Sequence, residues 1–396
     1  MSRLDRRGVL KLLATAGAAG LVTACGGRNR SDSRSSSAQP LRIGLLVPSS
    51  GPLLTIGEQI RNGFRHYLAE TGGLLGDHPV REVVADEGET RESAREAAEQ
   101  LLQQEVHAIV GVANPAVLAE LTPLVEEAHV PLLSANGSAP DLRGGPYLWR
   151  TAFLNSEPGL ALGRYLASEV DGPVAIIAQD DQFGIDAVAG LREAFATAQA
   201  SNRLAEPIFT RHRDVLAEDG LAGTLNLLAD QRPAAVFAAY SGEAASAFLT
   251  QYLHAGLSPR RLYGPADLTE GPVLEALGKD TLGIRTASNY APELRGSTNQ
   301  LFALSYRDEF GPPTTYAVAA YDAAAVLDTA IRLVDGDITP RLLTLALGEV
   351  GLIDSPRGRW QFNQSRTPTQ RWYLRQVAWD GPVIANLVVG ELGTLG

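Results

Sequence analysis

Short apolar runs alternate with helical periods from Leu41 almost to the end of the chain, and this alternation limits the fold more than any other feature. The first run, 42–47, is mostly apolar and stops at Pro48, as expected of a buried strand. A helix is predicted at about 57–71, where Ile60, Phe64 and Leu68 lie four residues apart on one side. Further strands follow at 80–84, 108–110 and 130–133, with helices at 91–104 and 116–128. This order predicts a parallel sheet covered by helices on both faces.

The same pattern then begins again. Helices are expected at 158–170, 185–198, 216–230 and 243–255, and strands at 174–178, 207–210 and 234–238. The last part of the chain adds two helices, at 298–310 and 316–333, and strand-like segments at 359–362, 372–377 and 383–389. We therefore predict an α/β protein with two doubly wound lobes that face each other across a cleft.

The N-terminal segment carries the marks of an exported lipoprotein. Arg6 and Arg7 precede an apolar stretch from Leu12 to Val22, and small residues lead to Cys25, the only cysteine in the chain. The pattern is that of a signal peptide at 1–24 with a twin-arginine-like start and a lipobox, followed by a serine-rich, flexible linker at 25–40. The alternatives are a membrane-spanning anchor, for which the run is short of the about 20 residues required, and a buried cysteine. We expect lipid attachment at Cys25, on the extracytoplasmic face of the cell membrane, by either the twin-arginine or the general secretory route.

Composition argues against several function classes. The formal net charge is −11, and the first 24 residues, with four basic side chains against one acidic, leave −14 for the rest. Such an acidic body repels phosphate backbones, so we expect no nucleic-acid partner. The six histidines are scattered without metal-ligand spacing, and the chain contains no HExxH, P-loop, GxSxG or CxxC motif. We therefore expect no metal, no cofactor and no enzymatic activity.

A set of motifs in a fixed order resembles one known family. The segments that carry the resemblance are Ile43 to Pro52, Gly57 to Phe64, Gly72-Gly73 with Asp86, Ile109-Val110-Gly111, Pro131 to Pro140, Trp149-Arg150-Thr151, Asp181-Gln182-Phe183-Gly184, Tyr306 to Gly311 and Tyr316 to Ala323. They resemble the periplasmic leucine/isoleucine/valine-binding proteins, which are substrate-binding components of ABC importers. The likeness runs from about Leu41 to Val377.

This resemblance implies a type I periplasmic binding fold, in which two Rossmann-like lobes joined by three crossovers close on a ligand like a hinge. Lobe 1 would comprise residues 41–152 and 286–355, and lobe 2 residues 153–285 and 356–396. The implied partners are a small-molecule ligand and an ABC permease in the membrane, and we expect a monomer. The ligand would lie where strand ends and helix N-termini meet.

Two loops are implied to hold the ligand's carboxylate. The resemblance gives this role to the backbone of Asn136 and the hydroxyl of Ser138, although Asn136-Gly137 is also a common turn pair. Asn114 stands where the family usually has serines that bind the same carboxylate, and it is followed by Pro115, which has no N–H to donate. Asn114 is therefore expected either to replace that contact with its amide or to cap the next helix.

Three residues of lobe 2 complete the implied site. Phe183 and Tyr240 match aromatic residues that line the family's ligand, with ordinary packing at the lobe edge as the alternative. Asp267 matches the acidic residue that receives the ligand's ammonium, and its alternative role is to cap a helix at 272–277. Ile56 replaces an aromatic residue common in relatives, so branched-chain specificity is not carried over. Glu270 and Tyr290 are further candidates at the cleft edge.

The resulting hypothesis is a lipoprotein that captures a small amino acid, most simply an aliphatic one, for an ABC importer. Amides, urea and aromatic acids remain open as ligands. The alternative is an extracytoplasmic sensor of the same fold that reports such solutes to another membrane protein, because fold alone does not separate the two functions.

Overall fold

The computed structural model describes residues 40–140 and 145–396. The predictions for the signal peptide, Cys25 and the linker up to residue 39 lie outside the described residues. The described residues all belong to one compact unit, Gln39–Gly396.

The first sheet has six strands in the order β2-β3-β1-β4-β5-β6. Only the pairing of β2 with β3 is antiparallel within this described sheet. The strands are β1 (Leu41–Val47), β2 (Leu74–Leu75), β3 (His78–Asp86), β4 (Ala108–Gly111), β5 (Leu132–Ser134) and β6 (Leu148–Arg150). The predicted parallel order of the first unit is confirmed.

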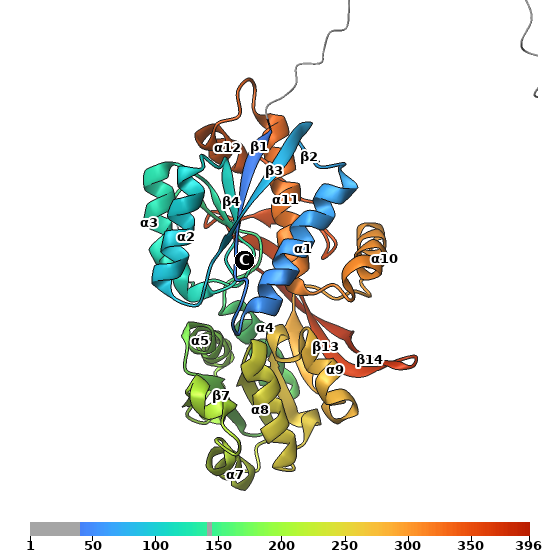
Figure 1. Cartoon of the computed structure of the whole chain (residues 1–396). Coiled ribbons are helices and arrows are strands. Elements are labelled where there is room, and N and C mark those ends of the chain that lie inside the picture. Colours follow the sequence, from blue (N-terminus) through green and yellow to red (C-terminus); the bar gives the residue numbers. More distant parts are fainter. Residues whose placement is uncertain (1–39, 141–144) are drawn as a thin grey trace, which may run out of the picture. The chain divides into compact units, whose positions relative to one another are not determined.

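Alternate side chains of β1 explain why helices cover both faces of this sheet (Figure 1). Ile43 and Leu45 pack in one core with the apolar sides of α1 (Leu54–Glu70) and α11 (Thr315–Leu333). Leu46 points to the opposite core, with α2 (Arg91–Gln103) and α3 (Leu118–Ala128). A strand buried on both sides is apolar throughout, which is why its sequence shows no alternation.

The second sheet has eight strands, seven in the order β12-β13-β11-β10-β9-β7-β8, with β14 paired to β13. They are β7 (Val174–Gln179), β8 (Ile208–Thr210), β9 (Ala235–Ala239), β10 (Leu262–Pro265), β11 (Arg285–Ser288), β12 (Gln361–Phe362), β13 (Pro368–Asp380) and β14 (Val383–Leu395). Ile176 of β7 packs in the core that contains α4 (Glu157–Glu169) and α5 (Gln182–Thr197). Ile177 packs on the other side, with α7 (Ala222–Asp230) and α8 (Gly242–His254).

The chain crosses between the two sheets three times: after β6, after β11 and after α12 (Pro340–Leu347). The predicted architecture of two Rossmann-like lobes with three crossovers is therefore confirmed. The predicted lobe boundary between residues 285 and 286 falls inside β11, whose strand pairs with β10 and β13. We propose to place this crossover after Ser288 and keep the other lobe limits as predicted.

One of the predicted helices is divided in the structure. The helix expected at 216–230 is interrupted, because Asp219 has a positive φ of 55° and a Cβ on Gly220 would lie 2.1 Å from the carbonyl oxygen of Asp214. The remaining helices are α6 (His212–Leu216), α9 (Pro272–Leu277) and α10 (Ser297–Phe310). Short 3-10 turns lie at Pro115–Val117, Ser201–Arg203, Pro259–Arg261, Ala266–Thr269 and Gly278–Thr281.

Candidate functional site

A cavity of about 330 Å³ lies where loops from the carboxyl ends of strands in both sheets meet. The first sheet contributes the loops after β1, β4 and β5, and the second contributes those after β7, β9 and β10. In open α/β sheets this edge is where small molecules bind, because loops and helix N-termini converge there. The cavity is therefore the candidate site.

The structure brings four of the six predicted binding residues to this cavity. Asn114, Asn136, Phe183 and Asp267 line it, as does Ile56. Phe183 is the second residue of α5 and is 8% exposed.

Ser138 and Tyr240 do not line the cavity. Ser138 is fully buried, and its hydroxyl accepts a hydrogen bond from Arg150 Nε at 2.7 Å. Tyr240 is also fully buried; its ring stacks on Phe248 at 4.2 Å between centroids, and its hydroxyl lies 2.8 Å from Thr210 Oγ1. In this conformation both side chains serve the packing of their own lobe.

The loop after β4 is held by a buried glutamate that the sequence did not single out. Glu87 accepts the backbone N–H groups of Ala113 and Asn114, each at 2.8 Å. Complete burial raises the pKa of the Glu87 carboxyl to about 8, although both N–H groups lower it. The side-chain oxygen of Asn114 accepts the N–H of Ala116 at 3.0 Å, so Asn114 caps the 3-10 turn Pro115–Val117 as well as lining the cavity.

Asn136 closes the next loop by local hydrogen bonds. Its Nδ2 donates to the carbonyl oxygen of Ala113 at 2.7 Å, and its Oδ1 accepts the N–H of Gly137 at 2.7 Å. The amide therefore ties the loop after β5 to the loop after β4.

Asp267 lies in the 3-10 turn after β10 and is 4% exposed. Its Oδ1 accepts a hydrogen bond of 2.6 Å from the hydroxyl of Tyr316 in α11, while Oδ2 has no partner among the described residues. Burial raises the pKa of the Asp267 carboxyl to about 6, and the Tyr316 hydroxyl opposes this shift. Gly271 occupies the cap position of α9, so Asp267 does not cap that helix.

Sequence reasoning gave no role in the site to several polar residues at or next to the cavity, which are Asn155, Gln179, Gln182, His212, Ser241, Glu243 and Tyr316. Gln179 and Gln182 lie at the carboxyl end of a strand that the sequence did predict, and this position was the available signal. Asn155 lies in the first crossover, and Tyr316 contacts the site only through Asp267. No local pattern marks either of these two residues.

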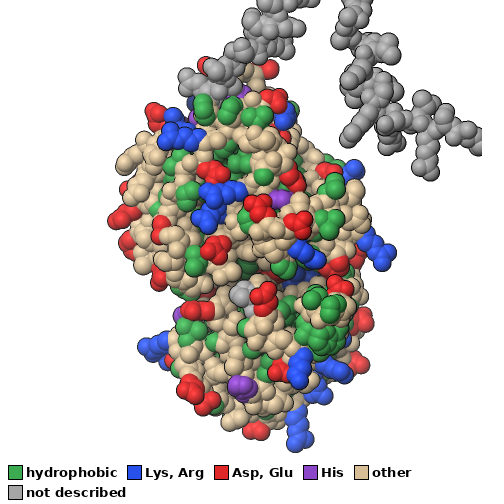
Figure 2. All heavy atoms as spheres, turned by 45° about the vertical axis from the view of Figure 1, so that its right-hand side comes forward, with side chains coloured by type: hydrophobic (Ala, Val, Ile, Leu, Met, Phe, Trp, Pro, Cys, Tyr) green, Lys and Arg blue, Asp and Glu red, His purple; other side chains and the backbone are tan. Residues whose placement is uncertain are grey.

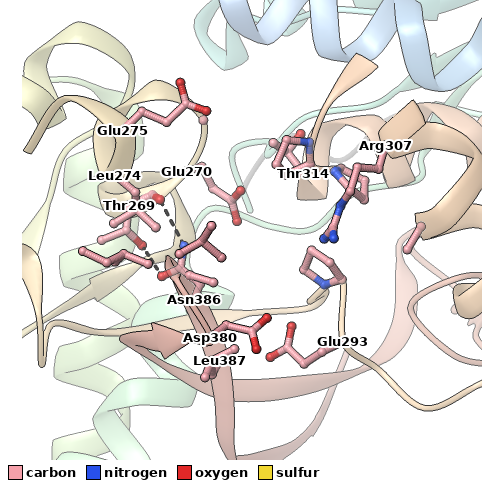
Figure 3. Close-up of a pocket in the computed structure, with 18 of the residues that line it drawn as sticks. Thr269, Glu270, Leu274, Glu275, Glu293, Arg307, Thr314, Asp380, Asn386 and Leu387 are labelled. Carbon is pink, nitrogen blue, oxygen red and sulfur yellow. Dashed lines mark hydrogen bonds between the residues drawn. The ribbon is translucent and has the colours of Figure 1, made fainter. Parts of the chain in front are cut away.

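A second, larger cavity of about 1160 Å³ lies between α9, α10 and the β13–β14 hairpin (Figure 3). Glu270 lines it and forms an ion pair with Arg375 at 2.7 Å. Figure 3 shows the Asp380 and Glu293 side chains pointing toward each other across the cavity. Tyr290, the other edge candidate, is fully buried and lines neither cavity.

Comparison with known proteins identifies the fold. The model of the family described as periplasmic binding protein matches residues 40–382, which is most of the chain. The chain belongs to the periplasmic binding protein family. It is 28% identical over 351 residues to the Leu/Ile/Val-binding protein homolog 6 of Brucella abortus (strain 2308), covering 86% of this chain and 88% of that protein.

Solved periplasmic binding proteins show the same architecture. A solute-binding protein of an ABC transporter from R. palustris, in complex with benzoate, superposes with a TM-score of 0.80 at 27% identity and covers 90% of this chain and 97% of its own. A leucine-binding protein from Thermotoga maritima superposes with a TM-score of 0.76 at 17% identity, covering 87% of this chain and 99% of its own. The periplasmic leucine/isoleucine/valine-binding resemblance and the type I fold are thus confirmed.

Family membership makes this chain a solute-binding protein rather than an enzyme and implies an extracytoplasmic location. Within residues 40–140 and 145–396 no helix is long and apolar enough to cross a membrane. The same residues contain no group of three or more His, Cys, Asp or Glu side chains placed to hold a metal ion. On the face in Figure 2, basic side chains are scattered among acidic ones rather than gathered into a patch.

Proposed function

We propose that this protein is the substrate-binding lipoprotein of an ABC importer. It captures a small amino acid or a related polar solute in the cavity between its lobes and delivers it to a permease. The supporting observation is a cavity of about 330 Å³ at the strand ends of both sheets, with a buried aspartate whose Oδ2 lacks a hydrogen-bond partner among the described residues. The R. palustris relative is itself a solute-binding protein of an ABC transporter.

Asp267 is the residue on which this proposal can be tested. A cationic or N–H-bearing group of the ligand would meet Oδ2, and the closed site would exclude water from the contact. Asp267→Ala should therefore weaken calorimetric binding of an ammonium-bearing ligand by about 3 kcal/mol or more, upward of about a hundredfold. The control is Asp337→Ala, because Asp337 is exposed. Equal affinities for wild type and Asp267→Ala would remove Asp267 from the site.

Attachment to the membrane is a separate part of the proposal. Cys25 follows small residues after an apolar stretch, which is the arrangement that lipoprotein processing requires. Full-length protein expressed in a bacterial host should fractionate with the membrane, whereas Cys25→Ser should be released in soluble form after export. Membrane association of both forms would contradict lipid anchoring at this residue. We further propose that the protein acts as a monomer.

A further inference from the structure

Three of the residues that line the small cavity each carry a buried side-chain oxygen without a hydrogen-bond partner among the described residues: Asn155 Oδ1, Gln179 Oε1 and Asp267 Oδ2. Asn155 is fully buried and Asp267 is 4% exposed. The orientation of the Asn155 amide is set by its neighbour, because Nδ2 donates to Asp186 Oδ2 at 3.1 Å and leaves the oxygen unpaired. A buried acceptor without a donor destabilises the folded protein, so a ligand that donates to these atoms recovers that free energy.

The charged side chains of the cavity favour the same kind of ligand. Its wall contains three carboxyl groups, those of Asp181, Glu243 and Asp267, and no arginine or lysine among the described residues that line it. Among the described residues that line the cavity, His212 is the side chain that could carry a positive charge. Its Nε2 already lies 3.2 Å from Glu243 Oε1. A ligand carboxylate would lose its hydration without meeting a cation, which is costly in a closed site.

In the loop after β4, the backbone donors that could have replaced such a cation are already in use. The N–H groups of Ala113 and Asn114 donate to Glu87, Pro115 has none, and the N–H of Ala116 donates to Asn114. In the neighbouring loop, the N–H of Gly137 donates to Asn136 Oδ1 and that of Ser138 to the carbonyl oxygen of Phe153. The side chain of Glu87 thus occupies two N–H groups in the loop where the family resemblance places a ligand's carboxylate.

We infer that the ligand of this site is a nitrogenous solute with several N–H donors and no net negative charge, such as an amine, an amidine or a primary amide. This inference rests on the proposed solute-binding function and narrows its substrate class to related polar solutes without a carboxylate, which leaves out free amino acids. The N–H groups donate to Asn155, Gln179 and Asp267. The hydroxyl of Ser241, which also lines the cavity, can serve the carbonyl oxygen of an amide. The ligand then differs in charge from the benzoate bound by the R. palustris relative.

Matched probes test this inference because they differ only in the polar group. Benzoate, benzamide and benzamidine form one set, acetate, acetamide and acetamidine a second, and L-leucine with L-leucinamide a third. Thermal shift followed by calorimetry should find at least one amide or cation that binds about tenfold or more tightly than its matched acid. A matched acid that binds more tightly than its amide and amidine overturns the inference but leaves the proposed function standing. The absence of binding in all three sets contradicts the proposed function, and this inference with it.

Two variants separate the contributions to binding. Asp267→Asn should weaken the cationic probe about tenfold or more and leave the neutral amide within about threefold, because an asparagine still offers an oxygen acceptor. Gln179→Leu should weaken both probes, since it removes one acceptor and no charge. The matched control is the exposed Asp337→Asn, which should bind like the wild type. Circular dichroism should first show that Asp267→Asn is folded. If this variant then binds the cationic probe as tightly as the wild type, Asp267 does not receive a cation and the inference fails for charged ligands.

Discussion

At the scale of single residues, the contact between Asp267 and Tyr316 joins the two lobes inside the site. Tyr316 belongs to α11, which packs along α1, whereas Asp267 follows a strand of the second sheet. Tyr316→Phe removes the 2.6 Å hydrogen bond and leaves Oδ1 as well as Oδ2 without a donor among the described residues. We expect the free energy of unfolding in urea to fall by about 1–3 kcal/mol.

A double-mutant cycle with Asp267→Ala shows whether that cost comes from the hydrogen bond itself. In the Asp267→Ala background the carboxyl group is gone, so the additional Tyr316→Phe change should cost much less than it does alone. Costs that add without any coupling would show that the two side chains do not stabilise each other.

Glu87→Gln tests how a buried carboxyl group links stability to pH. Burial raises the pKa of Glu87 from 4.5 to about 8, so the folded protein holds this proton more tightly than the unfolded chain does. The resulting stabilisation is complete below about pH 4.5 and is lost as the pH rises toward 8. Between about pH 5 and pH 8, the free energy of unfolding should therefore fall less in Glu87→Gln than in the wild type.

Part of the slope should persist in that variant, because burial also raises the pKa of Glu157 to about 8 and those of Asp267 and Asp322 to about 6. The exposed Glu349→Gln serves as the control and should keep the full pH dependence of the wild type. Identical slopes for all three proteins, measured by urea unfolding at several pH values, would show that Glu87 does not take up this proton.

The site residues show what sequence reasoning could and could not reach. Resemblance to the family's motifs assigns a residue to the site, and this resemblance pointed to Asn114, Asn136, Phe183 and Asp267, which all line the cavity. It does not say which way a side chain points. Tyr240 comes directly after β9, yet its ring turns onto α8, where it stacks on Phe248. Direction depends on packing partners that are distant in sequence.

At the scale of helices and strands, the two sheets were predictable where local signals were strong. The strands β1, β7 and β9, which lie inside their sheets, are buried apolar runs and were predicted within about two residues. The strands β10 and β11 were missed. They have only four residues each. They include Gly264, Pro265 and the polar side chains of Arg285, Thr286 and Ser288, and they become strands because neighbouring strands supply their hydrogen bonds.

The packing of α1 against α11 provides an element-scale prediction. A Cβ at Gly63 in α1 would lie 2.0 Å from the carbonyl oxygen of Ala317 in α11, far inside contact distance. Gly63→Ala should therefore force the helices apart and lower the free energy of unfolding by about 1–3 kcal/mol.

The chain supplies a matched control for this substitution. Gly223 lies in α7, and a Cβ there would meet nothing within 4 Å among the described residues. Gly223→Ala should stabilise the protein by up to about 1 kcal/mol, because alanine favours the helix. Chemical denaturation measures the free energy of unfolding of both variants. If Gly63→Ala destabilises the protein no more than Gly223→Ala does, α1 and α11 do not approach each other as closely as described.

At the scale of the whole molecule, the crossovers between the lobes share a buried polar network. Arg357, which precedes β12, forms a 2.8 Å ion pair with Asp322 of α11 and donates to the carbonyl oxygen of Thr151 at 2.7 Å. Asp322 also accepts hydrogen bonds from Ser355 Oγ at 2.9 Å and Trp360 Nε1 at 3.0 Å. The first and third crossovers are thus bound to each other and to lobe 1, so a hinge motion must preserve or move this network as a unit.

Arg357→Met measures what this network contributes to the molecule, because it keeps a long side chain but removes the guanidinium. Arg357 is 3% exposed, and its loss leaves the carboxyl group of Asp322 buried without a cation. We expect the free energy of unfolding in urea to fall by about 3–5 kcal/mol, as for other buried ion pairs that lose one partner. The same substitution two residues later, Arg359→Met, is the control: that side chain is 71% exposed and lies 3.9 Å from Asp354, so its effect should stay within about 0.5 kcal/mol. If both variants lose a similar amount of unfolding free energy, the crossovers do not depend on Arg357. The apolar cores of the two lobes would then have to hold the hinge alone.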